Sequence, residues 1–171
     1  MLLLAGCASV PPVDFTLQEI SIAPVRQDAE LRSLTVGYAP QVVQRTVESD
    51  ASIPPVWKEA LQDALNRSLV FTDDASTRVN LSVRITEFDI PAEGFTMTTR
   101  VSAIYEVIDR SDGALLFSEE ISSEGIVPLD YAFMGGVRMV ESWNRAVRVN
   151  IADFLDRLGS SRLVGDMQPP K

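Results

Sequence analysis

Residues 79–125, VNLSVRITEFDIPAEGFTMTTRVSAIYEVIDRSDGALLFSEEISSEG, decide the fold of this chain. Apolar and polar residues alternate in three consecutive segments of this stretch, and two short turn sequences separate them. Alternation with a period of two is typical of strands with one buried face, and short turns join strands that run antiparallel. The stretch therefore predicts a three-stranded meander over residues 79–90, 95–108 and 114–125, with turns at 91–94 and 109–113.

One face of this meander is predicted to be buried. Its apolar residues are Val79, Leu81, Val83, Ile85, Phe95, Met97, Val101, Ala103, Tyr105, Val107, Leu115, Phe117 and Ile121. The alternation changes phase at Glu87, where Phe88 and Ile90 take over the apolar positions, so we expect a β-bulge there. The other face carries Thr96, Thr98, Arg100, Ser102 and Glu106, and its polar composition leaves it open to water or to a partner.

Two helices flank the meander along the chain. Pro54 and Pro55 open the first, because the first helical turn tolerates proline, and this helix is predicted to end near Val70. Its apolar face consists of Trp57, Ala60, Leu61, Ala64, Leu65 and Ser68. The second helix is predicted over residues 137–158, with an apolar stripe of Val140, Trp143, Val147, Ile151, Phe154 and Leu158. Gly159 is predicted to end it.

The alternating segment EISIAPV, residues 19–25, predicts a further strand ahead of the first helix. Residues 26–54 contain strand-like residues interrupted by Gly37 and Pro40, so we expect an edge hairpin or a draped loop there. The element order is then strand, helix, three strands, helix. Both helices bury their stripes most simply on one face of the sheet. The predicted fold class is α+β, a two-layer sandwich with a four-stranded, mainly antiparallel sheet.

Cysteine occurs once, at position 7, in the segment LLLAGC. Leu4-Ala5-Gly6-Cys7 resembles the lipobox of bacterial lipoproteins, in which small residues precede the cleavage site and the thiol accepts a diacylglycerol. The expected organisation is a truncated signal peptide that lacks the usual basic region and long apolar region, then a lipidated tether, one α+β domain and a loose tail. These parts are predicted over residues 1–6, 7–18, 19–158 and 159–171, respectively.

The lipobox resemblance has further implications. It implies a covalent diacylglycerol and an additional acyl chain on Cys7, and two or three chains anchor a protein stably to a membrane. Ala8 and Ser9 follow the cysteine, in place of the aspartate that commonly retains such lipoproteins in the inner membrane. The resemblance therefore implies an outer-membrane lipoprotein that faces the periplasm.

A wider resemblance rests on LLLAGCAS, on the helix VWKEALQDALNRSLVF after a long extended region, and on the late strands and helix. These features together resemble the ABC-type transport auxiliary lipoproteins. Peptidoglycan-synthase activator lipoproteins have a similar order of strands and helices, so both families stay open. The resemblance implies an accessory lipoprotein that binds a protein complex of the envelope, either transport or cell-wall machinery.

The composition argues against several classes of function. A formal net charge of −9 repels phosphate backbones, so nucleic acid is not an expected partner. The sequence contains no histidine, which excludes histidine-dependent triads and a histidine zinc site. We therefore expect no enzymatic activity, no metal, and no cofactor beyond the acyl chains. An envelope acyltransferase is a remote alternative. The UDP-N-acetylglucosamine acyltransferases, however, are hexapeptide-repeat helices with a catalytic histidine, and this chain has neither.

The candidate contact site is the segment that joins the last predicted strand to the last helix, IVPLDYAFMGG, residues 126–136, which we call the connector. It places Leu129, Tyr131, Phe133 and Met134 where a loop is ordinarily polar. Nearby, Arg138, Arg145 and Arg148 form a cationic flank of the last helix.

Two interpretations of the connector stay open. In the first, the apolar side chains cap the core and the arginines are solvated. In the second, both groups contact a protein partner or a lipid. A lipid- or amphiphile-binding module, with the connector as the mouth of its site, is accordingly the second candidate function.

Overall fold

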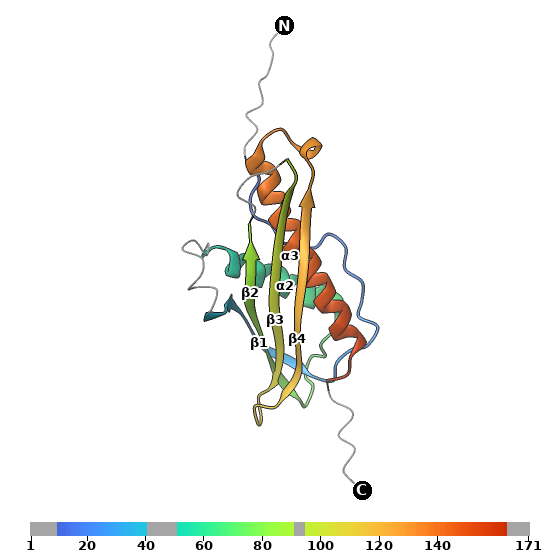
Figure 1. Ribbon diagram of the computed structural model, residues 1–171. Coiled ribbons are helices and arrows are strands. Elements are labelled where there is room, and N and C mark those ends of the chain that lie inside the picture. The colour runs from blue at the N-terminus through green and yellow to red at the C-terminus, as the bar shows by residue number, and fades with distance from the viewer. Residues whose placement is uncertain (1–9, 41–50, 91–94, 164–171) are drawn as a thin grey trace.

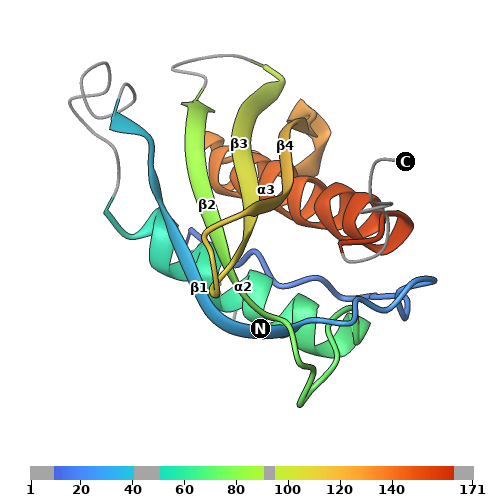
Figure 2. The same ribbon diagram turned by 90° about the horizontal axis from the view of Figure 1, so that it is seen from below.

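The structure is a computed structural model that describes residues 10–40, 51–90 and 95–163. Its labelled elements are β1 (Glu30–Tyr38), α2 (Ile53–Ser68), β2 (Arg78–Asp89), β3 (Met97–Asp109), β4 (Leu115–Val127), the 3₁₀ turn η1 (Leu129–Tyr131) and α3 (Gly135–Ser160). The strands form a four-stranded sheet in the order β1-β2-β3-β4, and both helices cover one face of it (Figure 1, Figure 2). The predicted α+β class, with a mainly antiparallel sheet, is confirmed.

The meander β2-β3-β4 has the predicted pairing. Val83 lies opposite Tyr105, which in turn lies opposite Glu119 on β4, and both strand pairs are antiparallel. The register of β2 shifts between Ile85 and Glu87, which confirms the predicted bulge. The tight turn between β3 and β4 uses Gly113 at a φ of +79°, a conformation that glycine adopts without strain. The other predicted turn, at 91–94, lies outside the described residues.

The core lies between the sheet and the helices. All the residues predicted for the buried face of α2 are buried, and Ile53 joins them at its first turn. On α3 the predicted stripe is buried, with Trp143 half-buried against Phe88 of β2. The ring of Phe154 stacks on that of Tyr105, with ring centroids 4.2 Å apart. Both helices therefore bury their stripes on one sheet face, as expected.

Two residues assigned to the buried face are exposed. Phe95 precedes the start of β3 at Met97, so its side chain lies beyond the end of the sheet and is 79% exposed. Leu115 is 55% exposed because the register between β3 and β4 shifts at Val107 and Ile108. The shift pairs Leu115 with Ile108, so its side chain points to the open face of the sheet.

The first strand was predicted in the wrong place. Residues 19–25 form no strand, because their backbone groups pair with helix ends: Ala23 N–H donates to Ser68 O (2.8 Å) and Val25 N–H to Gly159 O (3.1 Å). The first strand is β1, inside the segment predicted to be a loop or an edge hairpin, and it runs parallel to β2. It is an edge strand of the sheet, and Gly37 lies within it. Helix α2 forms the crossover between these two parallel strands.

The ends of the domain extend further than predicted. Phe15 and Leu17, assigned to the tether, are 0% and 8% exposed and belong to the core. At the other end, α3 continues through Gly159 to Ser160, so this glycine does not end it. Leu163 of the predicted tail is buried, and its N–H donates to Gln27 Oε1 at 2.9 Å. Within the described part of the chain, no helix is both long and apolar enough to cross a bilayer.

Candidate functional site

The connector displays its apolar side chains to solvent. Phe133 is 99% exposed, Leu129 and Tyr131 are each 48% exposed, and Met134 is 41% exposed. Phe133 therefore does not cap the core, and the other three side chains each leave about half of their surface open to solvent. Exposed apolar side chains that gather in one place are typical of contact surfaces.

The connector is held in place by hydrogen bonds from the helix that follows it. Arg138, in the first turns of α3, is only 5% exposed and reaches back under the loop. Its Nη1 donates to Ala132 O at 2.6 Å and to Phe133 O at 3.0 Å. Tyr131 N–H donates to Pro128 O at 3.3 Å and closes the 3₁₀ turn η1. These bonds fix the backbone beneath the exposed rings.

Arg145 ties the connector to the end of β4. Its Nη1 donates to Ile126 O at 2.9 Å, its Nε donates to Glu141 Oε1 at 2.8 Å, and its guanidinium lies 5.0 Å from the centroid of the Tyr131 ring. Arg148, one turn further on, donates to Asp14 O at 2.7 Å. The predicted cationic flank is thus built into the domain, and its contact with an external partner stays a prediction.

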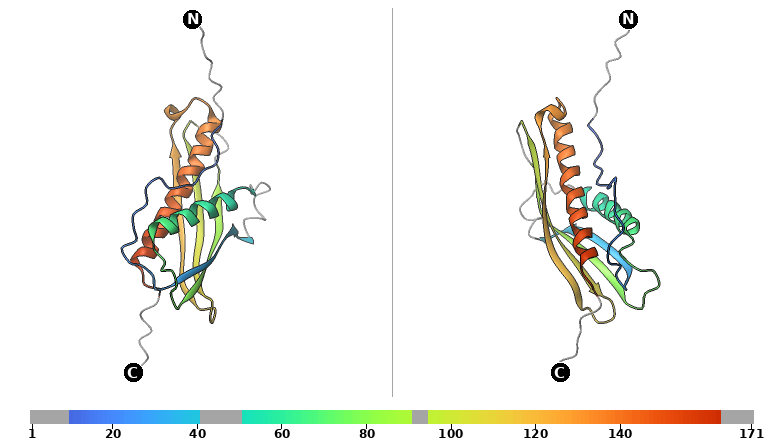
Figure 3. Two further views of the ribbon diagram at one scale, coloured as in Figure 1. Left: turned by 180° about the vertical axis from the view of Figure 1, so that it is seen from behind. Right: turned by 90° about the vertical axis from the view of Figure 1, so that its right-hand side faces the viewer.

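The chain reaches the connector from the amino-terminal side as well. We call residues 10–18 the N-terminal strap. Asp14 N–H donates to Asn144 Oδ1 at 2.9 Å, which pins the strap against α3 (Figure 3). At its start, Val10 is half exposed and meets the connector: a Cβ on Gly136 would lie 3.5 Å from Val10 Cγ2. Cys7, the predicted lipidation site, lies outside the described residues, three positions before Val10.

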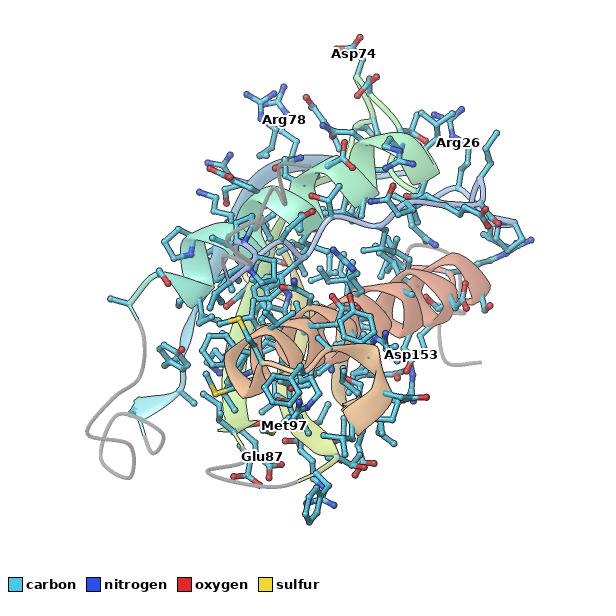
Figure 4. All side chains as sticks on the ribbon, turned by 90° about the horizontal axis from the view of Figure 1, so that it is seen from above. Arg26, Asp74, Arg78, Glu87, Met97 and Asp153 are labelled. Carbon is cyan, nitrogen blue, oxygen red and sulfur yellow. The ribbon has the colours of Figure 1, made fainter. Side chains whose placement is uncertain are left out.

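Two further exposed apolar residues lie at the same end of the sheet. Met97, at the start of β3, lies opposite Val127, the last residue of β4. The chain therefore enters β3 after Phe95 and leaves β4 into the connector at the same end of the strands. Ile126 is 51% exposed on the open face. We call the set Phe95, Ile126, Leu129, Tyr131, Phe133 and Met134 the connector surface. Figure 4 looks onto this end, where Met97 lies near the first turn of α3.

Sequence analysis missed Phe95 and Ile126 as members of this surface. Phe95 falls on an apolar position of a predicted strand, and Ile126 lies in the predicted connector but was not named among its contact residues; strand periodicity does not show where a sheet ends. It also missed a buried polar cluster between α3 and the sheet. In this cluster Tyr105 OH donates to Asn150 Oδ1 at 2.8 Å, and Asn150 Nδ2 donates to Ile121 O at 2.8 Å. Burial raises the pKa of Tyr105, so its hydroxyl stays a donor that joins helix to sheet.

The opposite end of the molecule is polar. An open depression of about 630 Å³ is lined by Arg32, Ser76, Thr77, Arg78, Asp109, Arg110 and Ser111, around the turn between β3 and β4. Glu30 already pairs with Arg32 at 2.6 Å and with Arg78 at 3.7 Å. The described residues contain no group of three or more side chains arranged to hold a metal ion. The exposed apolar side chains of the connector therefore make it a stronger candidate for a contact site than this polar depression.

The sequence matches no protein-family model and no curated protein. Solved structures do match. A protein of the DUF330 family from Xanthomonas campestris has a TM-score of 0.59 at 9% identity, over 81% of this chain and 89% of that one. A variant of the PelC dodecamer from Paraburkholderia phytofirmans has a TM-score of 0.48 at 16% identity, and the match covers 81% of this chain and 93% of that one. A minor lipoprotein of Acinetobacter baumannii has a TM-score of 0.37 at 13% identity, and the match covers 82% of this chain and 90% of that one. The likeness to the Xanthomonas protein shows that this chain shares its fold.

Proposed function

We propose that this chain is an accessory lipoprotein of the bacterial cell envelope, anchored by acyl chains on Cys7 and facing the periplasm from the outer membrane. The observation that carries the proposal is the position of the strap. The described part of the chain begins at Val10, which lies beside the exposed connector, and Val10 is only three positions after the lipobox cysteine in the sequence. The resemblance to ABC-type transport auxiliary lipoproteins suggests that it serves an envelope protein complex.

The proposed role is binding rather than catalysis. The sequence has no histidine, so the commonest general base near neutral pH is missing. Acidic and basic side chains on the open face are paired across the strands: Arg84 holds Glu106 through two hydrogen bonds, and Arg100 holds Glu124 at 2.6 Å. A polar face whose charged side chains are already paired suits binding to another protein better than it suits catalysis.

The test of the anchor uses the chain expressed behind a complete lipoprotein signal peptide. Mass spectrometry of the mature protein should find diacylglycerol and an amide-linked acyl chain on Cys7, and the protein should fractionate with the outer membrane. The Cys7→Ala protein should be released into the soluble fraction. A Cys7→Ala protein that still fractionated with the outer membrane would refute the anchor.

The test of the partner uses the anchored protein after cross-linking in cells. The proposal predicts that cross-links from the domain reach subunits of one transport or cell-wall complex. The Arg84→Glu variant, which reverses a charge on the open face, should lose these cross-links while keeping its membrane fraction. Cross-links spread at random over abundant envelope proteins, unchanged by the charge reversal, would contradict an accessory role.

A further inference from the structure

We infer that the connector surface is occupied by the lipid bilayer that holds the Cys7 anchor, so that the exposed rings dip into its interface. The inference rests on the proposed acylation of Cys7 and names what the connector contacts. It replaces the expectation of a protein partner at this surface. The protein partner is left to the faces that point away from the membrane.

The length of chain before the described residues restricts where the anchor lies. Three residues span at most about 11 Å, so the backbone of Cys7 lies within that distance of Val10. Val10 in turn touches the first turn of α3 at Gly136, directly after the connector. The strap cannot swing freely, because Phe15 is buried and Asp14 is bonded to Asn144 and Arg148. An acylated Cys7 therefore holds the connector against the membrane surface.

The side chains at this end suit a bilayer interface. Aromatic residues favour the boundary between headgroups and acyl chains, where an apolar ring and a polar edge are both accommodated. Phe133 is almost fully exposed, the ring of Tyr131 carries a polar hydroxyl, and Leu129 and Met134 are purely apolar. The backbone beneath them is fixed by Arg138, so the rings stay exposed instead of folding inward.

The charge at this end also suits a phospholipid surface. The protein as a whole carries a net charge of −9, which anionic headgroups repel. Over residues 126–145, however, the charges balance: Asp130 and Glu141 stand against Arg138 and Arg145, and Arg145 pairs directly with Glu141. Arg138 is 5% exposed and donates to the connector carbonyls instead of reaching the surface. The acidic protein therefore meets the membrane with an apolar tip that carries no net charge.

The orientation follows from the shape of the domain. The connector, the start of α3 and the start of the strap lie at one end of the long axis, and the turn between β3 and β4 lies at the other (Figure 1). Helix α3 has 26 residues, which corresponds to a length of about 39 Å. The domain then stands on the membrane, with its open sheet face and its far end free for a protein partner.

The experiment places a spin label at each end of the acylated full-length chain. Cys7 is the only native cysteine and is blocked by acylation, so Phe133→Cys and the matched control Leu115→Cys each supply one reactive thiol. Leu115 is exposed at the opposite end, at the start of β4. The labelled proteins are reconstituted into vesicles of phosphatidylethanolamine and phosphatidylglycerol. The label at 133 should collide more often with oxygen than with a water-soluble nickel chelate, and the label at 115 should show the reverse.

A second measurement removes the rings. A single acyl chain holds a protein only marginally, so a form with one chain on Cys7 reports the contribution of the connector. Replacing Tyr131 and Phe133 together by alanine should lower its vesicle partition by about tenfold or more, since each 1.4 kcal/mol of lost binding is a factor of ten. Leu115→Ala should leave the partition unchanged. Equal partition of all three proteins would overturn the inference.

The remaining outcomes separate this inference from the proposed function. If the acylated chain does not float with the vesicles at all, the anchor proposal fails and the inference fails with it. If the chain floats while the label at 133 stays in water, the anchor stands and the membrane contact alone is refuted. Spin–spin broadening between labels at 133 would show that a second copy covers the surface, and this also overturns the inference.

Discussion

At the scale of single residues, the close approach of α3 to the sheet depends on Gly125 in β4. A Cβ at this position would lie 2.0 Å from Ser142 O and 2.5 Å from Ala146 N, both in the backbone of α3. The helix thus approaches the strand at the one place where the strand has no side chain. Ser142 and Thr99 share a hydrogen bond of 2.7 Å beside this contact. Small and polar side chains there set the distance between helix and sheet.

We expect the Gly125→Ala substitution to destabilise the domain by about 3 kcal/mol or more, because backbone atoms cannot move aside as a flexible side chain would. The matched control is Gly37→Ala, where an added Cβ meets nothing within 4 Å and which should change stability by less than about 0.5 kcal/mol. Urea denaturation followed by circular dichroism measures both. Equal midpoints for the two variants would show that α3 can shift away from β4 without cost.

At the scale of elements, the two faces of β2 have opposite environments. Val83 is 1% exposed beneath the helices, and its neighbour Ser82 lies on the open face opposite Glu106. A strand directs successive side chains to opposite faces, so the two positions differ only in direction. The same new side chain at each position therefore tests the face assignment directly.

The Val83→Asn substitution should destabilise the domain by about 3 kcal/mol, since it removes a buried apolar side chain and buries an amide without partners. Ser82→Asn should cost less than about 1 kcal/mol, because the amide remains hydrated. Thermal melting and urea midpoints give both values. A loss at position 82 as large as that at 83 would place the core on the other face of the sheet.

The connector is an element whose side chains contribute little to stability. We expect Tyr131→Ala combined with Phe133→Ala to change the unfolding free energy by less than about 1 kcal/mol, because Phe133 is fully exposed and Tyr131 is about half exposed. Phe154→Ala, at a fully buried ring stacked on Tyr105, should cost about 3–5 kcal/mol. Differential scanning calorimetry of the three proteins compares them. A double variant that unfolds as readily as Phe154→Ala would show that the rings stabilise the core.

At the scale of the whole molecule, the N-terminal strap brings the start of the described chain to the connector end of the domain. It closes the layer of helices by burying Phe15 and Leu17, and its hydrogen bonds to α3 direct the chain toward the connector. The two ends of the long axis therefore differ in character, one apolar and next to the start of the strap, the other polar. The proposed anchor on Cys7 would give a domain with this asymmetry one preferred orientation.

The strap also carries a pH dependence. Hydrogen bonds from Thr16, together with the nearby Arg148, hold the pKa of Asp14 below its ordinary value. A carboxyl with a lowered pKa stabilises the folded state above its unfolded pKa, and this contribution is lost as the pH falls through the folded pKa. The native protein should therefore be more stable than Asp14→Asn at pH 7, by at most about 1 kcal/mol because the side chain is half exposed.

This difference should shrink as the pH falls below about 4, the ordinary range of an aspartate. Urea denaturation of both proteins across that range measures it, and exchange of the Phe15 amide shows whether the strap loosens first. A stability difference that stays constant down to the lowest pH would mean that the charge of Asp14 does not contribute.

The sequence by itself determined the meander, both helices and the faces that they bury. These features are local: alternation and helical spacing put Val83, Tyr105 and Phe154 on buried faces whatever lies further along the chain. It also indicated the connector as an unusually apolar loop. The bulge at Glu87 was visible for the same reason, since a change of phase appears within one strand.

Only the tertiary structure decided which segment became the edge strand and which apolar side chains of the strands and the connector stay exposed. Residues 19–25 alternate as a strand does, yet their amides bond to the carboxyl ends of both helices, and 30–38 pairs with β2 instead. Arg138 and Arg148 look like a solvated flank, yet they hold the connector and the strap. The physical reason is the same throughout: which distant backbone group satisfies a given donor depends on the assembled fold, and no local period records it.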